Sequence, residues 1–95
     1  MLAEFAERHP DAVEPLDRWY RIARCAPWAS LAEVRVEFPH ADIVRVASGN
    51  LVTVFNVAGN KYRLITAIHY NRQVIYTLRV LTHAEYSRGR WKERL

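Results

Sequence analysis

Four side chains in the second half of the chain have the chemical properties needed to cut RNA: Lys61, Arg63, His83 and Tyr86. Side chains alternate between the two faces of a strand, so Lys61 and Arg63 are expected on one face, roughly 6–7 Å apart. When a 2′-hydroxyl attacks its neighbouring phosphate, an enzyme must supply a proton acceptor, a proton donor and positive charge at the phosphoryl oxygens. Two cations, an imidazole and a phenol meet these requirements without a metal ion.

Three of these residues, Arg63, His83 and Tyr86, also have a simpler explanation. An arginine on a strand, such as Arg63, is often solvated or half of a salt bridge. A histidine after a strand, such as His83, often caps an element or lies on the surface. A tyrosine such as Tyr86 is commonly a packing residue with a hydrated hydroxyl group. Their expected coincidence at one end of a sheet favours a shared function.

Residues 51–57, 62–70 and 73–81 are rich in β-branched and aromatic residues, which is typical of strands. Turn-forming residues separate them at 58–60 and 71–72, so the sequence predicts a three-stranded antiparallel meander. A tight second turn sets the register of its hairpin. The opposed pairs are then Lys61 with Thr82, Arg63 with Val80, and Asn60 with His83. In this register the candidate side chains meet at one end of the sheet.

Helical signals fill the chain before the strands. A short helix around Phe5 is expected to end before Pro10. Asp11 and Glu14 have the spacing of a capping box, which predicts a second helix that runs to about Cys25.

A second capping-box spacing, from Ser30 to Glu33, predicts a third helix that ends at Pro39. The buried stripe expected on the second helix consists of Val13, Leu16, Tyr20 and Ala23, with Trp19 beside it. Because helices and strands are segregated along the chain, the predicted fold class is α+β. The helices should cover one face of the sheet and leave the other face concave and partly wet.

The composition fits one domain spanning residues 1–95. Hydrophobic residues make up 51% of the chain, enough for a single core. Cys25 is the only cysteine and is expected to be a buried thiol, so no internal disulfide can form. The sequence shows no secretory signal and no membrane-spanning run, and a cytoplasmic location is expected.

The net charge of +4 is unevenly distributed. Residues 1–48 carry six arginines and eight acidic residues, whereas residues 49–95 carry eight basic residues and two acidic ones. The basic half is therefore expected to face a polyanion, of which nucleic acid is the commonest in a cytoplasm. The cations expected to contact RNA are Lys61, Arg79, Arg88, Arg90 and Lys92. Trp91 lies among them and is expected to fold back over the sheet, with stacking on a base as the alternative.

No metal or cofactor is predicted. The four histidines, at positions 9, 40, 69 and 83, lack the spacing of metal ligands, and the single cysteine makes a zinc site improbable. The sequence contains no glycine-rich phosphate loop and no nucleophile-elbow serine.

Several segments resemble the HigB family of bacterial toxins, which belongs to the RelE-like superfamily of messenger-RNA interferases. The matching segments are VFNVAGNKYRL at 54–64, THAEY at 82–86, HPDA at 9–12, WY at 19–20 and EFP at 37–39. The resemblance implies the toxin of a type II toxin–antitoxin system, with a RelE-like fold. It also implies a metal-independent endoribonuclease that cleaves messenger RNA in the A site of the 30S subunit and so inhibits translation. A HigA-like helix-turn-helix antitoxin is implied as partner.

The resemblance also implies a role for each matched residue. Arg63 would stabilise charge on the phosphate, and Lys61 would hold the substrate. His83 would transfer a proton, and Tyr86 would support or share that role. Asn60 would shape the turn and contact RNA.

One departure from the family pattern is expected to matter. Members of the family usually begin with a short strand before the first helix, whereas here the chain leads almost directly into that helix. Either the sheet lacks an edge strand or the natural start lies further upstream. A bare edge exposes backbone groups to pairing, and we expect the antitoxin or a second copy of the chain to cover it.

Two other functions remain open from the sequence. A non-catalytic RNA- or ribosome-binding domain would keep the basic residues and make no use of His83. A DNA-binding regulator is disfavoured, because the helices belong to the acidic half and a recognition helix should carry positive charge.

Overall fold

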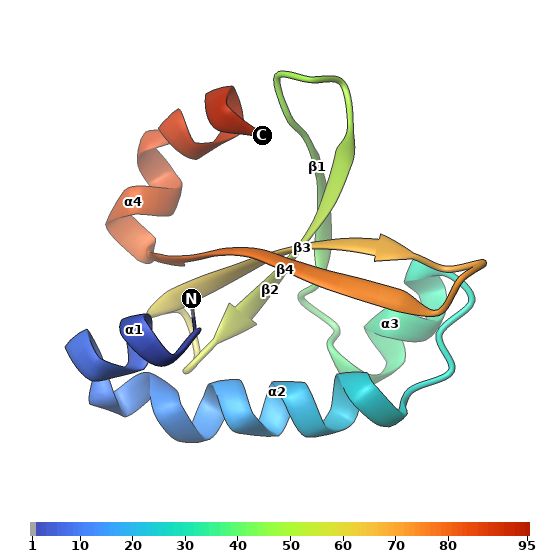
Figure 1. Cartoon of the computed structure of the whole chain (residues 1–95), viewed down its shortest axis with the longest axis horizontal. Coiled ribbons are helices and arrows are strands. Elements are labelled where there is room, and N and C mark those ends of the chain that lie inside the picture. The colour runs from blue at the N-terminus through green and yellow to red at the C-terminus, as the bar shows by residue number, and fades with distance from the viewer. Residues whose placement is uncertain (1) are drawn as a thin grey trace.

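The computed structural model describes residues 2–95 and places helices on both sides of an antiparallel sheet (Figure 1). The predicted α+β class is confirmed. On one side lie α1 (Leu2–Arg8), the 3-10 turn η1 (Pro10–Ala12), α2 (Val13–Cys25) and α3 (Leu31–Glu37). The sheet consists of β1 (Asp42–Arg45), β2 (Leu51–Val57), β3 (Tyr62–His69) and β4 (Val74–Thr82). On the other side lie α4 (His83–Arg88) and the 3-10 turn η2 (Arg90–Arg94).

The predicted ends of the helices are confirmed, but their caps differ from the prediction. Asp11 lies inside η1 and does not cap α2, whose N-cap position is taken by Ala12 without any side-chain bond. Ser30 stands at the N-cap of α3, yet its side chain makes no capping bond. A capping box does form at α4, between Thr82 and Glu85. This spacing is present in the sequence and was missed because it follows directly on a strand.

The buried stripe of α2 is rotated relative to the prediction. Leu16, Trp19 and Ala23 are buried, while Val13 and Tyr20 are 49% and 51% exposed. The buried residues have the i, i+3, i+7 spacing of one helix face. Trp19 is therefore the centre of that face, and its ring meets Phe55 edge-on at 5.4 Å between centroids.

The sheet has four strands in the order β1-β2-β3-β4, and not the three that were predicted. The additional strand, β1, is short and mostly exposed, with charged residues at both ends. It was missed because four residues give too little of an alternating pattern. It pairs with β2 and makes one edge of the sheet, and β4 makes the other.

The register of β3 and β4 changes along the hairpin. Near the turn the pairs follow the predicted register, as in Ala67 with Tyr76. A β-bulge then inserts Leu78, because Thr66 pairs with Thr77 and the preceding residue of β3, Ile65, pairs with Arg79. The predicted pairs of Lys61 with Thr82 and of Arg63 with Val80 are therefore wrong by one residue, and Asn60 and His83 lie outside the paired strands. The observed pairs are Tyr62 with Thr82, Arg63 with Leu81, and Leu64 with Val80.

Hydrophobic side chains are buried on both faces of the sheet. The helix-side core contains Trp19, Trp28, Val34, Phe55 and Leu64. The opposite core contains Val52, Val54, Ile65, Leu81 and Trp91. The second face is therefore only partly open to solvent, since the C-terminal segment covers part of it. The expected return of Trp91 to the sheet is confirmed.

Two further observations concern solvent and membranes. Cys25 is an exposed free cysteine, which corrects the expected buried thiol. It is the last residue of α2 and lies two residues after buried Ala23, off the buried face of the helix. Within residues 2–95, no helix has the length and apolar character needed to cross a bilayer.

Candidate active site

The candidate site is built around the turn between β2 and β3. Ala58 and Gly59 both have positive φ, 54° and 68°, and the amide of Lys61 donates to the carbonyl of Ala58 at 3.3 Å. This left-handed geometry is cheap for glycine and costly for alanine. The tight turn brings the carbonyls of Asn60 and Lys61 to the start of β3.

Arg63 is held by the backbone of this turn. Its Nη1 donates to the carbonyl of Asn60 at 3.1 Å and to the carbonyl of Tyr62 at 3.2 Å. Within the described residues its other guanidinium nitrogens make no hydrogen bond, so they are available to an anionic ligand. Arg63 is half-buried, which makes this permanent charge more effective than one in bulk water.

An aromatic stack supports the guanidinium of Arg63. The central carbon of the guanidinium lies 5.4 Å from the ring centroid of Tyr86. Tyr86 also stacks with Trp91, with 5.4 Å between centroids and 20° between planes. The indole Nε1 of Trp91 donates to the carbonyl of Tyr86 at 3.2 Å. The buried indole therefore fixes Tyr86, and Tyr86 in turn supports the cation.

His83 begins α4 directly beside the turn. Its amide donates to the carbonyl of Lys61 at 2.9 Å. The capping box stabilises this end of α4, because the Thr82 hydroxyl accepts from the Glu85 amide at 3.2 Å and the Glu85 carboxylate accepts from the Thr82 amide at 3.0 Å. The imidazole is exposed, and its Nδ1 lies 3.4 Å from the hydroxyl oxygen of Ser87.

The contact with Ser87 leaves Nε2 of His83 for proton transfer. When Nδ1 donates to Ser87, the neutral imidazole has an unprotonated Nε2 that can act as a base. The doubly protonated imidazolium keeps the same bond to Ser87 and can act as an acid through Nε2. His83 and Tyr86 are three residues apart on α4, so their side chains lie on neighbouring parts of one helix face.

Lys61 does not join Arg63 on one face, which corrects the expected pair of parallel cations. Its ammonium group lies 2.8 Å from a carboxylate oxygen of Asp11, in the helical layer. The other carboxylate oxygen accepts from the Tyr62 hydroxyl at 2.6 Å. Lys61 stands in the turn before β3 begins, so strand alternation does not govern its direction.

The network around Asp11 shifts three titrations. Hydrogen bonds from Lys61 and then from Tyr62 lower the pKa of the Asp11 carboxyl. The hydrogen bond to Asp11 raises the pKa of Lys61, and the same kind of bond raises the pKa of Tyr62. All three shifts favour a negative carboxylate held by two donors.

The remaining RNA-contact candidates lie on several different elements. Arg88 ends α4, and Arg90 and Lys92 belong to η2, where Lys92 is exposed and Arg90 lies at the start of the turn. Arg79 is half-buried on β4, and its Nη1 donates to the carbonyl of Leu78 at 2.7 Å. The side chain of Asn60 accepts from Asn56 at 3.4 Å, which supports its expected part in shaping the turn.

The sequence interpretation missed two residues beside the site. Asp11 has the spacing of a helix cap, and nothing in the sequence indicates its bond to Lys61, fifty positions away. Ser87 has a detectable signal, since it lies four residues after His83 on a predicted basic segment. Residues four apart on a helix are neighbours.

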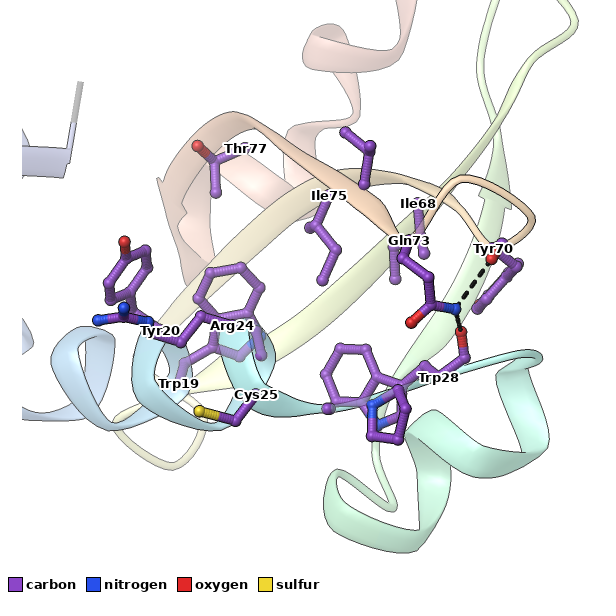
Figure 2. Close-up of a pocket in the computed structure, with 14 residues that line it drawn as sticks. Trp19, Tyr20, Arg24, Cys25, Trp28, Ile68, Tyr70, Gln73, Ile75 and Thr77 are labelled. Atoms are coloured by element: carbon purple, nitrogen blue, oxygen red, sulfur yellow. Dashed lines mark hydrogen bonds between the residues drawn. The ribbon is translucent and has the colours of Figure 1, made fainter.

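A separate cavity of about 430 Å³ lies between α2 and the end of the β3–β4 hairpin (Figure 2). Trp19, Trp28 and Ile75 line it, and the amide nitrogen of Gln73 donates to the carbonyls of Trp28 and Tyr70 at 2.8 and 3.0 Å. None of the candidate catalytic residues lines this cavity. It is therefore distinct from the candidate active site.

A comparison with protein families finds one that covers most of the chain. The model of the HigB toxin family, described as the RelE-like toxic component of a toxin–antitoxin system, matches residues 12–89. A search among curated proteins found no match. The family match spans all four strands and α4, and so includes the contact of Arg63 with Tyr86 and the start of α4 at His83. The chain belongs to the HigB family of RelE-like toxins, and as the toxic component of such a system it has an antitoxin as its partner.

Proposed function

We propose that this toxin is a ribosome-dependent endoribonuclease that cleaves messenger RNA in the A site of the small subunit without a metal ion. The observation that supports this most directly is the grouping at the β3–α4 junction. The Arg63 guanidinium lies over Tyr86, and His83 lies one helical turn before Tyr86. In the proposed site, this fixed cation, the imidazole and the phenol act on one phosphate.

The proposed reaction is an internal transfer of the phosphoryl group to the 2′-oxygen with release of the 5′-oxygen. The 2′-hydroxyl oxygen attacks the adjacent phosphorus and gives up its proton, while the bond from phosphorus to the 5′-oxygen breaks and that oxygen gains a proton. The products are a 2′,3′-cyclic phosphate and a free 5′-hydroxyl. His83 and Tyr86 share the two proton transfers, and Arg63 stabilises the charge that develops on the phosphoryl oxygens.

The proposed partners follow from the distribution of charge. Arg88, Arg90 and Lys92 extend positive charge from the site along the C-terminal segment, which suits ribosomal and messenger RNA. A HigA-like helix-turn-helix antitoxin would inhibit by covering this surface with acidic residues. A cytoplasmic location is part of the proposal, since translation takes place there.

The test is induction of the toxin in a bacterial host followed by mapping of messenger 5′ ends on translated and untranslated transcripts. Wild type should produce new ends within translated regions, and His83→Ala and Arg63→Ala should lose them. Arg72→Ala is the matched control, because Arg72 is an exposed arginine in the turn at the opposite end of the sheet. Growth arrest with uncut messenger would instead favour the non-catalytic ribosome-binding domain.

A further inference from the structure

The carboxylate of Asp11 joins the helical layer to the turn that carries the candidate site. One oxygen lies 2.8 Å from the Lys61 ammonium, and the other accepts from the Tyr62 hydroxyl at 2.6 Å. Tyr62 is buried, and its ring meets Phe5 edge-on at 5.2 Å between centroids. The first two residues after Asn60 are therefore both fixed by one carboxylate.

The backbone of this same turn holds the candidate catalytic groups. The carbonyl of Asn60 accepts from the Arg63 guanidinium at 3.1 Å, and the carbonyl of Lys61 accepts from the His83 amide at 2.9 Å. A shift of residues 60–62 would move both acceptors at once. The positions of Arg63 and of the beginning of α4 would then change, because both are held by carbonyls of this turn.

We propose that Asp11 is a positioning residue of the candidate site. It orients Arg63 and His83 indirectly, through the side chains of Lys61 and Tyr62 and the carbonyls of the turn. It does not touch the RNA. The activity part of this inference rests on the proposed nuclease function, whereas the geometric part does not.

The changes in RNA binding and in reaction rate after removal of the Asp11 carboxylate distinguish a positioning role from a purely electrostatic one. A carboxylate near an RNA site repels phosphate, so its removal alone should tighten RNA binding. Positioning predicts the opposite for the rate, because small displacements of catalytic groups slow the chemical step. The Asp11 and Lys61 side chains are 46% and 66% exposed, so the ion pair itself contributes little to folding.

The kinetic test compares Asp11→Ala with Asp42→Ala on programmed ribosomes. Asp42 is the matched control, because it also forms an exposed cation–carboxylate pair between two elements, with Arg35 at 3.5 Å. Asp11→Ala should lower kcat by ~10- to 100-fold with an unchanged or lower KM, at a temperature where both variants are folded. Asp42→Ala should stay near wild type.

A double-mutant comparison tests the proposed route. In a background carrying both Lys61→Met and Tyr62→Phe, the Asp11 carboxylate has neither of its partners. Asp11→Ala should then cause no further loss of kcat, because the three residues act as one unit. A full, additive loss in that background would overturn the inference.

NMR chemical shifts give a measurement that does not depend on RNA cleavage. Asp11→Ala should shift the ¹H–¹⁵N resonances of the His83 amide and the Arg63 side chain, and leave those of buried Val34 in place. Unmoved His83 and Arg63 signals together with wild-type kcat would overturn the positioning role and leave the nuclease proposal intact. A wild-type protein that cuts no messenger would refute the nuclease proposal, and the amide shifts would still decide whether Asp11 fixes the turn.

Discussion

The guanidinium carbon of Arg63 lies 5.4 Å from the centre of the Tyr86 ring, and this contact joins the third strand to the C-terminal helix. Tyr86 also stacks with the buried Trp91. The candidate site therefore depends on the return of the C-terminal segment to the sheet as well as on the strands. Each part of the site can be tested by substitution or by a change of solution conditions. These parts are the cation, the phenol, the indole that supports it, the anchoring carboxylate and the basic residues around them.

Arg63→Lys is expected to retain the positive charge and lose activity. A lysine cannot reproduce the planar group that bonds two turn carbonyls and lies on Tyr86. Cleavage of messenger on programmed ribosomes should fall at least ~10-fold. Arg72→Lys, in the opposite turn, should leave the rate unchanged, and equal rates for both variants would argue against a special role for Arg63.

Tyr86→Phe and Tyr86→Leu are expected to separate the hydroxyl from the ring. Phenylalanine keeps the stack with Trp91 and the support of Arg63, so the melting temperature should stay near that of wild type while cleavage falls ~10-fold through loss of the proton-carrying group. Leucine removes the ring as well and should also lower the free energy of unfolding by about 0.5–1.5 kcal/mol. Full activity in Tyr86→Phe would restrict Tyr86 to a packing role.

Trp91→Ala is expected to impair both stability and activity. The indole is only 6% exposed, so its removal should lower the free energy of unfolding by about 3–5 kcal/mol, measured by urea titration. Trp28 is the control, since it is 4% exposed in the core on the other face of the sheet. At a temperature where both variants are folded, Trp91→Ala should cut messenger more slowly than Trp28→Ala. Equal rates would show that Tyr86 does not need its indole support.

Acidification should reveal the ionised state of Asp11. Its pKa is lowered in the folded chain because Lys61 and Tyr62 donate to the carboxylate. The stabilisation is complete above the pKa of the unfolded chain and is lost as the pH falls through the folded pKa. The free energy of unfolding of wild type should therefore drop more steeply below about pH 4 than that of Asp11→Asn.

Unfolding measured at alkaline pH gives the matching control for Asp11. The pKa values of Lys61 and Tyr62 are raised by their bonds to Asp11. The stabilisation from these bonds therefore persists up to the ordinary pKa values of about 10 and is lost as the pH rises through the pKa values of the folded chain. Between about pH 5 and pH 9 the difference in unfolding free energy between wild type and Asp11→Asn should be constant. A difference that varies within this window would contradict the assignment.

Salt should weaken the binding of ribosomes to the toxin. Arg88 is exposed on α4, and Arg90 and Lys92 are exposed on η2. In a variant without these cations, the slope of log affinity against log salt should become shallower by about 0.7 for each phosphate that a removed cation had neutralised. The triple alanine variant is compared with Arg18→Ala, which removes an exposed arginine from α2. Equal slopes for wild type and the triple variant would place the RNA surface elsewhere.

Local sequence signals determined the ends of the elements. The helices end at Cys25 and Glu37, before the prolines that stop them, and β2 has the predicted bounds. Such signals depend on residues within a few positions of one another. The capping box from Thr82 to Glu85 is of the same kind and was within reach of sequence reasoning.

The candidate site was predicted only in part. Arg63 and Tyr86 do lie together, with His83 on the same short helix, although the predicted register was one residue off. The bulge at Leu78 could not be foreseen, because an inserted residue keeps the local strand pattern while it changes every later pair. The one-residue error in register had little effect on the predicted site. Arg63 contacts α4, and because α4 begins immediately after β4, the bulge shifts both elements together.

By itself, the sequence determined the α+β class, the helix ends, three of the four strands and the concentration of positive charge in the second half. Only the tertiary structure decided that Lys61 turns to Asp11, that Trp91 supports Tyr86 and that Arg63 lies against α4. Periodicity and capping act over a few residues and are encoded locally. The partners of a long charged or aromatic side chain depend on which distant segments the packed cores bring within a few ångströms, and the folded chain alone fixes that.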